Sequence, residues 1–335
     1  MTDLRIGFIG LGNVGGQLAG NLLRHGVTLT VRDIDAARVA ALVARGARAA
    51  ASPRELAAGV DVVITCLPSP AVCAAVMETE DGVLAGLAPG ALWLEMSTTD
   101  HEEVRRLAAR VAERGATALE CPVSGGCHRA ASGNISIFAG GTRAAFERAL
   151  PVLAILGQRI LHTGPLGSAS QLKVLTNYLC TVHLAALAEA LTVARVAGLD
   201  LNTAYEAIRI SSGNSFVHET ESQVILNGSR DINFTMDLVI KDVGLFDALA
   251  GSLGVPLELS PLVLAIFRDG ARRYGGRELS PNIIRRLEEA CGVRVLGTGF
   301  PAQLTDTEPK VAGYEVVPHR AQRIARGISR APARI

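Results

Sequence analysis

The stretch Arg5–Gly15, RIGFIGLGNVG, decides the fold of this chain. A short, mainly apolar run leads directly into the glycine-rich turn Gly10-Leu11-Gly12-Asn13-Val14-Gly15, and an amphipathic helical segment follows. In a strand–turn–helix unit of this kind, Gly10 permits the tight turn, Gly12 lets a phosphate approach the backbone, and Gly15 lets the helix lie close to the strand. The start of the helix then offers free N–H groups and a partial positive charge to an anion.

An acidic residue at the end of the next strand extends this motif. Asp33 lies 18 residues after Gly15, where a carboxylate accepts hydrogen bonds from the hydroxyls of an adenosine ribose. The motif therefore predicts a bound dinucleotide, and a carboxylate that repels a 2′-phosphate favours NAD over NADP. Arg32 and Arg38 leave NADP open as the less favoured cofactor, since either guanidinium can turn toward a 2′-phosphate. The competing interpretation is a glycine turn that binds nothing.

The first 163 residues alternate short apolar runs with amphipathic helical segments. Short, fully apolar strands between helices are typical of a parallel sheet that is covered on both faces. We therefore expect an α/β fold with a doubly wound, Rossmann-type sheet over residues 1–163. The predicted strands are 5–9, 28–32, 62–65, 92–95, 118–120, 135–139 and 159–162, and the predicted helices include 15–24, 36–45, 102–114 and 143–156.

A change of pattern near Gly164 marks a second domain. The segment GPLGSAS has the turn residues of a boundary, and an almost unbroken helical pattern runs from Ser170 until Gly198 ends it as a C-terminal cap. Residues 164–292 are therefore predicted to form an all-α substrate and dimerisation domain that begins with this long interdomain helix. Residues 293–335 are predicted to be a C-terminal extension, an irregular, partly extended arm followed by the basic tail HRAQRIARGISRAPARI.

The composition of the 335-residue chain excludes several classes of protein. Hydrophobic residues make up 49% and charged residues 19%, which supports a large buried core and excludes a mainly disordered chain. A net charge of +1 gives no global sign of nucleic-acid binding. The chain starts without the layout of a signal peptide, and polar residues interrupt its longest apolar stretch, 172–199. We therefore expect no membrane span and a cytoplasmic location.

The cysteines and histidines show no spacing typical of a metal site. The cysteines occur singly, without a CxxC pair, and no histidines are paired at metal-ligand spacing. We therefore expect no metal, and free thiols as in a reducing compartment. The six cysteines are Cys66, Cys73, Cys121, Cys127, Cys180 and Cys291.

Four further segments resemble the motifs of one enzyme family. They are Met96-Ser97-Thr98, the loop CPVSGG at 121–126, the segment GPLGSASQLKVLTN at 164–177, and Lys241-Asp242. Together with the glycine turn, they are similar in type and order to the motifs of the β-hydroxyacid dehydrogenases. This is the family of 3-hydroxyisobutyrate dehydrogenase and tartronate semialdehyde reductase. The resemblance covers residues 4–290.

Several positions depart from the family pattern. Glu120 stands where the family commonly has an aspartate, Ala169 where a glycine is frequent, and Thr176 where an asparagine is frequent. His128 and Arg129 place a potential cation beside the CPVSGG loop. These differences leave the expected reaction class unchanged and bear on the identity of the substrate.

The resemblance implies that Lys173 transfers a proton and that Asn177 assists it. An ordinary lysine is fully protonated at neutral pH, so burial beside a cationic nicotinamide has to lower the pKa of Lys173. Asn177 lies four residues later, on the same helical face, where it can hydrogen-bond either the Lys173 amine or the substrate. The competing interpretation is a solvated lysine on a long helix, which the apolar neighbours Leu172 and Val174 disfavour.

The other motif residues are expected to bind the substrate or the cofactor. The loop Ser124-Gly125-Gly126 offers converging hydrogen-bond donors, which favours the carboxylate of a small anionic substrate. The expected cofactor-binding residues are Gly10, Leu11, Gly12, Asn13, Val14, Gly15, Asp33, Leu67, Pro68, Thr98 and Lys241. A surface salt bridge of Lys241 with Asp237 or Asp242 is the alternative for that lysine. The candidates for substrate selectivity alone are His128, Arg129, Ser212, Asn214 and His218.

The resemblance therefore predicts an NAD-dependent oxidoreductase that transfers a hydride between a 3-hydroxy acid, or a close analogue, and the nicotinamide. Two alternatives are an imine reductase-like enzyme of the same architecture, which the presence of Lys173 disfavours, and a catalytically silent dinucleotide-binding module. Decarboxylation of a β-keto acid product stays open. The long helix, about 45 Å at 1.5 Å per residue, is longer than one small domain covers, which predicts a homodimer or homotetramer.

Overall fold

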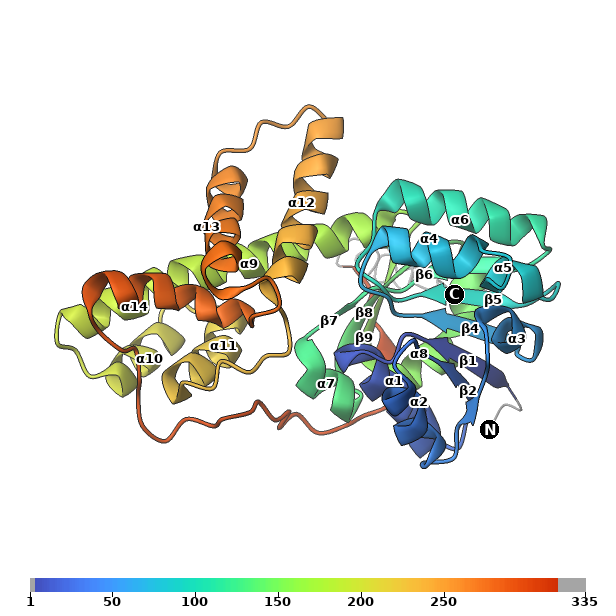
Figure 1. The fold of residues 1–335 in the computed structure, drawn as a ribbon, viewed down its shortest axis with the longest axis horizontal. Helices are drawn as coiled ribbons and strands as arrows, with labels where there is room; N and C mark the ends of the chain where they lie inside the picture. The colour runs from blue at the N-terminus through green and yellow to red at the C-terminus, as the bar shows by residue number, and fades with distance from the viewer. Residues whose placement is uncertain (1–3, 319–335) are drawn as a thin grey trace, which may run out of the picture.

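The computed structural model describes residues 4–318, and the basic tail lies outside these described residues. An N-terminal sheet domain and a C-terminal helical domain are joined by one long helix (Figure 1). The strands are β1 Arg5–Ile9, β2 Thr28–Arg32, β3 Arg48–Ala49, β4 Val62–Thr65, β5 Leu92–Glu95, β6 Thr117–Glu120, β7 Val123–Ser124, β8 Ile135–Gly140, β9 Gly157–Gly164 and β10 Tyr314–Glu315.

The helices fall into two groups. Those of the sheet domain are α1 Asn13–Arg24, α2 Ala36–Val43, α3 Pro53–Ala58, α4 Pro70–Glu78, α5 Val83–Gly86, α6 His101–Glu113, α7 Gly126–Ser132 and α8 Arg143–Leu156. The long helix and the helices after it are α9 Ser168–Val196, α10 Leu201–Arg209, α11 Phe216–Asn227, α12 Met236–Ser252, α13 Leu259–Tyr274, the 3-10 helix η1 Ser280–Ile284, and α14 Arg285–Cys291.

The sheet has the order β10-β9-β8-β6-β5-β4-β1-β2-β3, with β7 paired to β8. The neighbouring strands from β3 to β6 are parallel, whereas β8 is antiparallel to β6 and to β7. The chain builds outward from β1 to β3 and then crosses back to β4 on the other side of β1. In such sheets a crevice forms at this switch point, beyond the carboxyl ends of the strands. The site motifs lie at this edge.

Separate hydrophobic cores cover the two faces of the sheet. On one face α1 and α8 bury residues such as Leu18, Leu22 and Phe146. On the other face α3, α4 and α6 bury Met77 and Leu107, among others. Figure 1 shows α4, α5 and α6 above the sheet and α1 and α2 below it. The expected fold class, an α/β doubly wound sheet followed by a helical domain, is confirmed.

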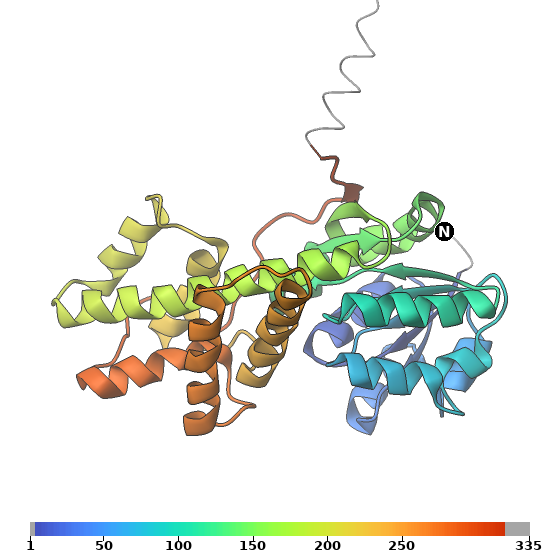
Figure 2. The ribbon, with the colours of Figure 1, turned by 90° about the horizontal axis from the view of Figure 1, so that it is seen from above.

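The 29-residue helix α9 runs from the sheet domain through the helical domain (Figure 2). By length and composition alone this helix could cross a bilayer. In the fold it carries the buried Lys173, and its residues Leu184, Leu187 and Leu191 contribute to the core of the helical domain. One face of the helix thus packs into the core of the protein.

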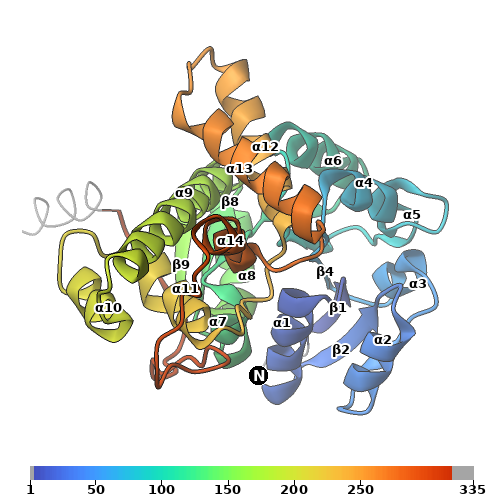
Figure 3. The same ribbon diagram turned by 60° about the vertical axis from the view of Figure 1, so that its left-hand side comes forward.

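Residues 293–318, the C-terminal arm, return from the helical domain to the sheet (Figures 1 and 3). Strand β10 near the end of the arm pairs in parallel with β9, at Tyr314–Arg159 and Glu315–Ile160. The expectation of an irregular arm thus missed one two-residue strand. The two-residue β3 and β7 were also not predicted, because such short pairings carry no periodic pattern of their own.

Candidate functional site

The glycine turn between β1 and α1 has no room for side chains at two positions. Gly10 has φ +93°, and a Cβ there would lie 2.2 Å from the carbonyl oxygen of Cys66. A Cβ on Gly15 would lie 2.0 Å from the carbonyl oxygen of Gly10. Helix α1 starts without a side-chain cap and without an acidic residue in its first turn, so its N-terminal N–H groups are available to a ligand. This cradle fits the pyrophosphate of a dinucleotide.

Asp33 is held beside this turn by two backbone hydrogen bonds. Its Oδ2 accepts from Leu11 N at 2.6 Å and its Oδ1 accepts from Asp35 N at 2.8 Å. The Arg38 guanidinium pairs with Asp35 at 3.3 Å, and its Nη1 lies 3.4 Å from where a Cβ of Gly12 would stand. The Asp33 carboxylate and the Arg38 guanidinium therefore both border the turn.

A buried carboxylate joins the turns that follow β4 and β5. Glu95 accepts hydrogen bonds from the Thr65 hydroxyl and from Ser97 N, the latter at 2.8 Å. The Ser97 hydroxyl in turn accepts from Leu67 N at 2.8 Å. Burial raises the pKa of Glu95, and the hydrogen bonds that it accepts oppose this shift. This network places Leu67, with Pro68 after it, beside the turn that contains Thr98, at the carboxyl edge of the sheet.

A second buried carboxylate, Glu120 at the end of β6, caps the long helix. Its side chain accepts hydrogen bonds from Ala169 N at 2.9 Å, from Ser170 N at 3.1 Å and from the Ser170 hydroxyl. Glu120 is 1% exposed, and a Cβ on Gly140 would lie 2.2 Å from its Oε1. The residue that departs from the family's aspartate therefore positions the first turn of α9, one turn before Lys173.

Lys173 and Asp242 are the buried ends of a hydrogen-bonded chain that runs through the partly buried Asn177. Its Nζ donates to Asn177 Oδ1 at 2.7 Å, and Asn177 Nδ2 donates to Asp242 Oδ2 at 2.5 Å. Lys173 is 7% exposed and Asp242 1% exposed. Burial lowers the pKa of Lys173, the nearby Lys241 lowers it further, and the charge of Asp242 opposes both. The interpretation of Lys173 as a solvated surface residue is therefore wrong.

Lys241 on α12 bridges the two domains. Its Nζ donates to the carbonyl oxygen of Thr98 at 2.7 Å and pairs with Asp242 at 2.6 Å. The ion pair that was considered as an alternative thus exists, but Asp242 is buried and Lys241 is only partly exposed. Asp242 was not among the predicted site residues. Its place directly after Lys241 in the Lys241-Asp242 motif was the available signal.

The expected substrate loop forms the junction of β7 and α7. Ser124 ends β7, and Gly125 and Gly126 have φ +128° and +85°, values that favour glycine. The loop therefore turns sharply and presents backbone N–H groups at the start of α7. Arg129, three residues further on, pairs with Glu308 of the arm at 3.4 Å. It is thus already engaged by an acidic residue.

The other selectivity candidates lie in different settings. Burial lowers the pKa of His128, which favours its neutral form. His218 is buried within the helical domain, where its ring contacts the Tyr205 carbonyl and the Ser222 hydroxyl. Asn214 donates to Glu219, and Ser212 is exposed. Among these candidates, the structure places only His128 and Arg129 directly beside the substrate loop.

The described residues contain no group of three or more metal-binding side chains. The cysteines near the site are in their thiol form, because burial raises the pKa of Cys66 to about 12 and that of Cys127 to about 11. A thiol of this kind is a poor nucleophile and a poor metal ligand. The polar chemistry at the cleft therefore comes from lysine, asparagine and carboxylate groups.

Comparison with known proteins agrees with this geometry. The model described as the NAD binding domain of 6-phosphogluconate dehydrogenase matches residues 5–164. A model described as the NAD-binding of NADP-dependent 3-hydroxyisobutyrate dehydrogenase matches residues 167–287. The 2-(hydroxymethyl)glutarate dehydrogenase of Eubacterium barkeri is 36% identical over 296 residues, which are 88% of this chain and 98% of that protein. The chain belongs to the β-hydroxyacid dehydrogenase family.

Two further relatives support the assignment of this β-hydroxyacid dehydrogenase. The 3-hydroxyisobutyrate dehydrogenase of Pseudomonas aeruginosa is 34% identical over 274 residues, which are 80% of this chain and 91% of that protein. A solved structure of 3-hydroxyisobutyrate dehydrogenase from Salmonella typhimurium is 32% identical, with a TM-score of 0.78, and covers 85% of this chain and 100% of its own. The family indicates NAD(P)-dependent hydroxyacid dehydrogenase activity.

Proposed function

We propose that the protein is an NAD-dependent dehydrogenase of a 3-hydroxy acid, with Lys173 as the general acid and base. The observation that carries the proposal is the hydrogen-bonded chain Lys173–Asn177–Asp242, which lies where Lys241 of the helical domain meets Thr98 of the sheet domain. A lysine whose pKa is lowered by burial can hold a neutral amine at a pH where an exposed lysine cannot. The proposal thus has a lysine of lowered pKa at the meeting point of the two domains.

Each residue of this chain has its own role in the proposed oxidation. Bound NAD supplies the hydride acceptor. In its neutral form, Lys173 would take the proton from the β-hydroxyl while the carbon that bears this hydroxyl gives up its hydride to the cofactor. In the reverse reduction, Lys173 would return the proton to the oxygen. Asn177 orients the amine by accepting its N–H, and Asp242 holds the amide of Asn177 in turn. Such positioning converts binding energy into correct reaction geometry.

Substitution of Lys173 tests the proposal directly. In an assay of NAD(H) and NADP(H) oxidation or reduction over a panel of hydroxy acids and semialdehydes, Lys173→Ala should lose about 10²–10⁴-fold in rate and still bind NAD. Arg195→Ala is the matched control, because Arg195 is an exposed residue near the far end of the same helix. Near-normal turnover by Lys173→Ala with the best substrate would refute the assignment.

The substrate is proposed to be a small anion. The loop Ser124-Gly125-Gly126 offers hydrogen-bond donors, and Lys173 and Lys241 lie on the helical side of the cleft. Arg129 does not support this proposal, because it is paired with Glu308. The names of the relatives, which include 2-(hydroxymethyl)glutarate, L-serine and 3-hydroxyisobutyrate, describe acids that carry a hydroxyl. A carboxylate held by the loop would leave the hydroxyl free to reach Lys173.

NAD is proposed as the preferred cofactor. The support is Asp33, whose carboxylate is fixed by Leu11 N and Asp35 N at the end of β2. A 2′-phosphate there would meet this negative charge. Arg38 already pairs with Asp35, which leaves it less available to a phosphate.

The assembly is proposed to be a homodimer or homotetramer in the cytoplasm, with no nucleic acid or membrane as a partner. Exposed apolar side chains recur every three or four residues on α9, which places them on one helical face. They include Leu172, Leu175, Leu179 and Val193. Light scattering should therefore give at least twice the chain mass at micromolar concentration, and Leu179→Glu should shift the mass toward the monomer. A monomeric wild-type protein would contradict this proposal.

A further inference from the structure

The C-terminal arm is anchored in the helical domain at its start. Val295 is fully buried in the core of this domain, and the Phe300 ring contacts Tyr205 edge to face at 5.1 Å. The Phe300 carbonyl accepts a hydrogen bond from Asn227 at 2.8 Å. The family models end at residue 287, so the arm lies beyond the part of the chain that they describe.

The second half of the arm is anchored in the sheet domain, around the end of α7. Asn134, which is 0% exposed, donates to Asp306 Oδ2 and to the Glu308 carbonyl, each at 2.7 Å. Lys310 donates to the carbonyl oxygen of Gly133. The arm therefore crosses between the two domains and is fixed on both.

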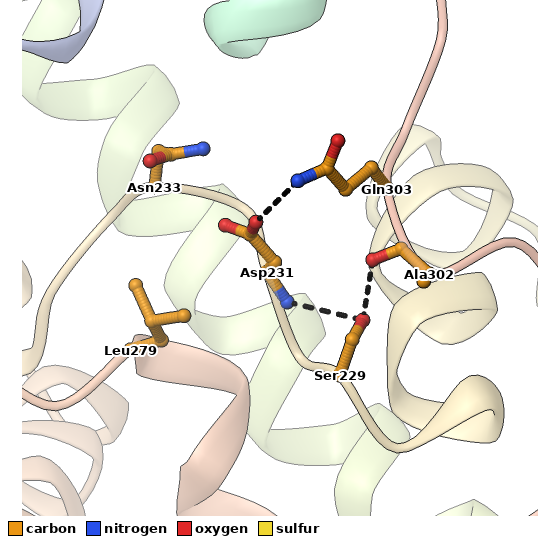
Figure 4. Close-up of a pocket in the computed structure, with 6 residues that line it drawn as sticks. All are labelled: Ser229, Asp231, Asn233, Leu279, Ala302 and Gln303. Carbon is orange, nitrogen blue, oxygen red and sulfur yellow. Dashed lines mark hydrogen bonds between the residues drawn. The ribbon is translucent and has the colours of Figure 1, made fainter.

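Between these anchors the arm borders an open cavity of about 610 Å³ (Figure 4). Gln303 donates to Asp231 Oδ2 at 3.4 Å, and the Ala302 carbonyl accepts from Ser229 at 2.6 Å. On the far wall of the cavity stands Asn233, whose carbonyl accepts a hydrogen bond from Asn13 of the glycine turn at 3.4 Å. The arm thus forms one wall of this cavity, and Asn233 on another wall is hydrogen-bonded to the expected cofactor turn.

Arg129 is where the arm meets the substrate loop. A Cβ on Gly125 would lie 3.1 Å from Arg129 Cδ, so the stem of this arginine covers the loop glycine. The Arg129 guanidinium lies over the Phe216 ring of the helical domain, 5.0 Å from its centre, and pairs with Glu308 of the arm at 3.4 Å. One side chain therefore contacts the loop, the helical domain and the arm.

We propose that Glu308 of the C-terminal arm is a positioning residue of the substrate loop, which holds Arg129 against Gly125 and Phe216. The inference rests on the proposed function, in which the loop binds the substrate carboxylate. Glu308 also pairs with Arg159 of β9, which fixes its carboxylate on the sheet domain. A guanidinium held between a fixed carboxylate and an aromatic face has few other orientations, and its stem then restricts the loop.

The proposal predicts a change in substrate binding and not in chemistry. Glu308→Gln keeps the shape of the side chain and removes its charge, so Arg129 loses its ionic partner. We expect the KM for the hydroxy acid to rise about tenfold, while kcat and the Kd for NAD stay within about twofold. A less ordered loop weakens the binding of the ground state and of the transition state equally, which raises KM and leaves kcat unchanged. The matched control is Glu315→Gln, which breaks the arm's ion pair with Arg143 at β10. This control should keep the wild-type KM.

Hydrogen–deuterium exchange of the segment 123–132 provides a readout that does not depend on activity. The proposal requires faster exchange there in Glu308→Gln than in Glu315→Gln or the wild type. It also requires that Arg129→Gln/Glu308→Gln raise the KM by less than the product of the two single effects, because both changes break the same ion pair. An unchanged KM, or exchange equal to that of the control, overturns the proposal. If the wild type oxidises no hydroxy acid, the proposed function fails, and the exchange experiment still decides whether Glu308 orders the loop.

Discussion

The charge of Asp242 should set the pH at which the enzyme gains activity. In the proposed mechanism, oxidation requires the neutral amine of Lys173, so the rate falls on the acidic side as this amine is protonated. Burial lowers the pKa of Lys173, and the negative charge of Asp242 partly restores it. Asp242→Asn removes that charge and retains an oxygen that can accept from Asn177. The acidic limb of the pH profile should therefore move to lower pH.

The size of this effect follows from the geometry of the hydrogen-bonded chain. The contacts of 2.7 Å and 2.5 Å on either side of the Asn177 amide put the two charges roughly 7 Å apart, which gives an interaction of about 2 kcal/mol at an effective dielectric constant of about 20. Since about 1.4 kcal/mol corresponds to one pKa unit, the limb should move by about 1.5 pH units.

The assay is kcat/KM for oxidation measured across the pH range, for the wild type and for Asp242→Asn. Asp237→Asn is the control, since Asp237 lies in the first turn of the same helix and is substantially exposed. The acidic limb of the kcat/KM profile of this control should lie at the same pH as that of the wild type. A limb that stays in place in Asp242→Asn, or that moves to higher pH, would refute the electrostatic link between Asp242 and Lys173.

Three further outcomes are expected. Glu120→Gln replaces the carboxyl group that accepts hydrogen bonds from Ala169 N and Ser170 N, at a cost of about 1–3 kcal/mol. Thermal denaturation should therefore give a lower Tm, and assays a lower kcat. An unchanged Tm would contradict the capping role. Asp33→Asn should reduce the ratio of kcat/KM for NAD over NADP, and a wild-type enzyme that prefers NADP would show that Asp33 does not select the cofactor. The methyl ester of the best hydroxy acid should react at least about tenfold less efficiently than the acid, since a charge-assisted hydrogen bond contributes about 1.5–3 kcal/mol, and equal efficiency would mean that no carboxylate is bound.

Local patterns in the sequence were sufficient for the fold and for most of the motifs. The turn Gly10–Gly15 works through backbone geometry that glycine alone permits, and its neighbours in the chain form the strand and the helix. Asn177 lies one turn after Lys173 on α9, so helical spacing alone predicts their contact. Features of this kind depend on residues that are close in the chain, so the spacing of residues in the sequence predicts them.

The partners of these residues were decided by the tertiary structure. Asn177 meets Asp242 65 residues later, and Glu120 caps a helix that begins almost 50 residues after it. The sequence indicates that Arg129 is a cation beside the substrate loop, but in the fold Arg129 forms an ion pair with Glu308 of the arm. An ion pair or a cap forms wherever the packing of distant elements places opposite charges together, and no spacing along the chain encodes that. The sequence therefore determined which groups the site contains, and only the packing of the two domains and the arm decided which of them are engaged with one another.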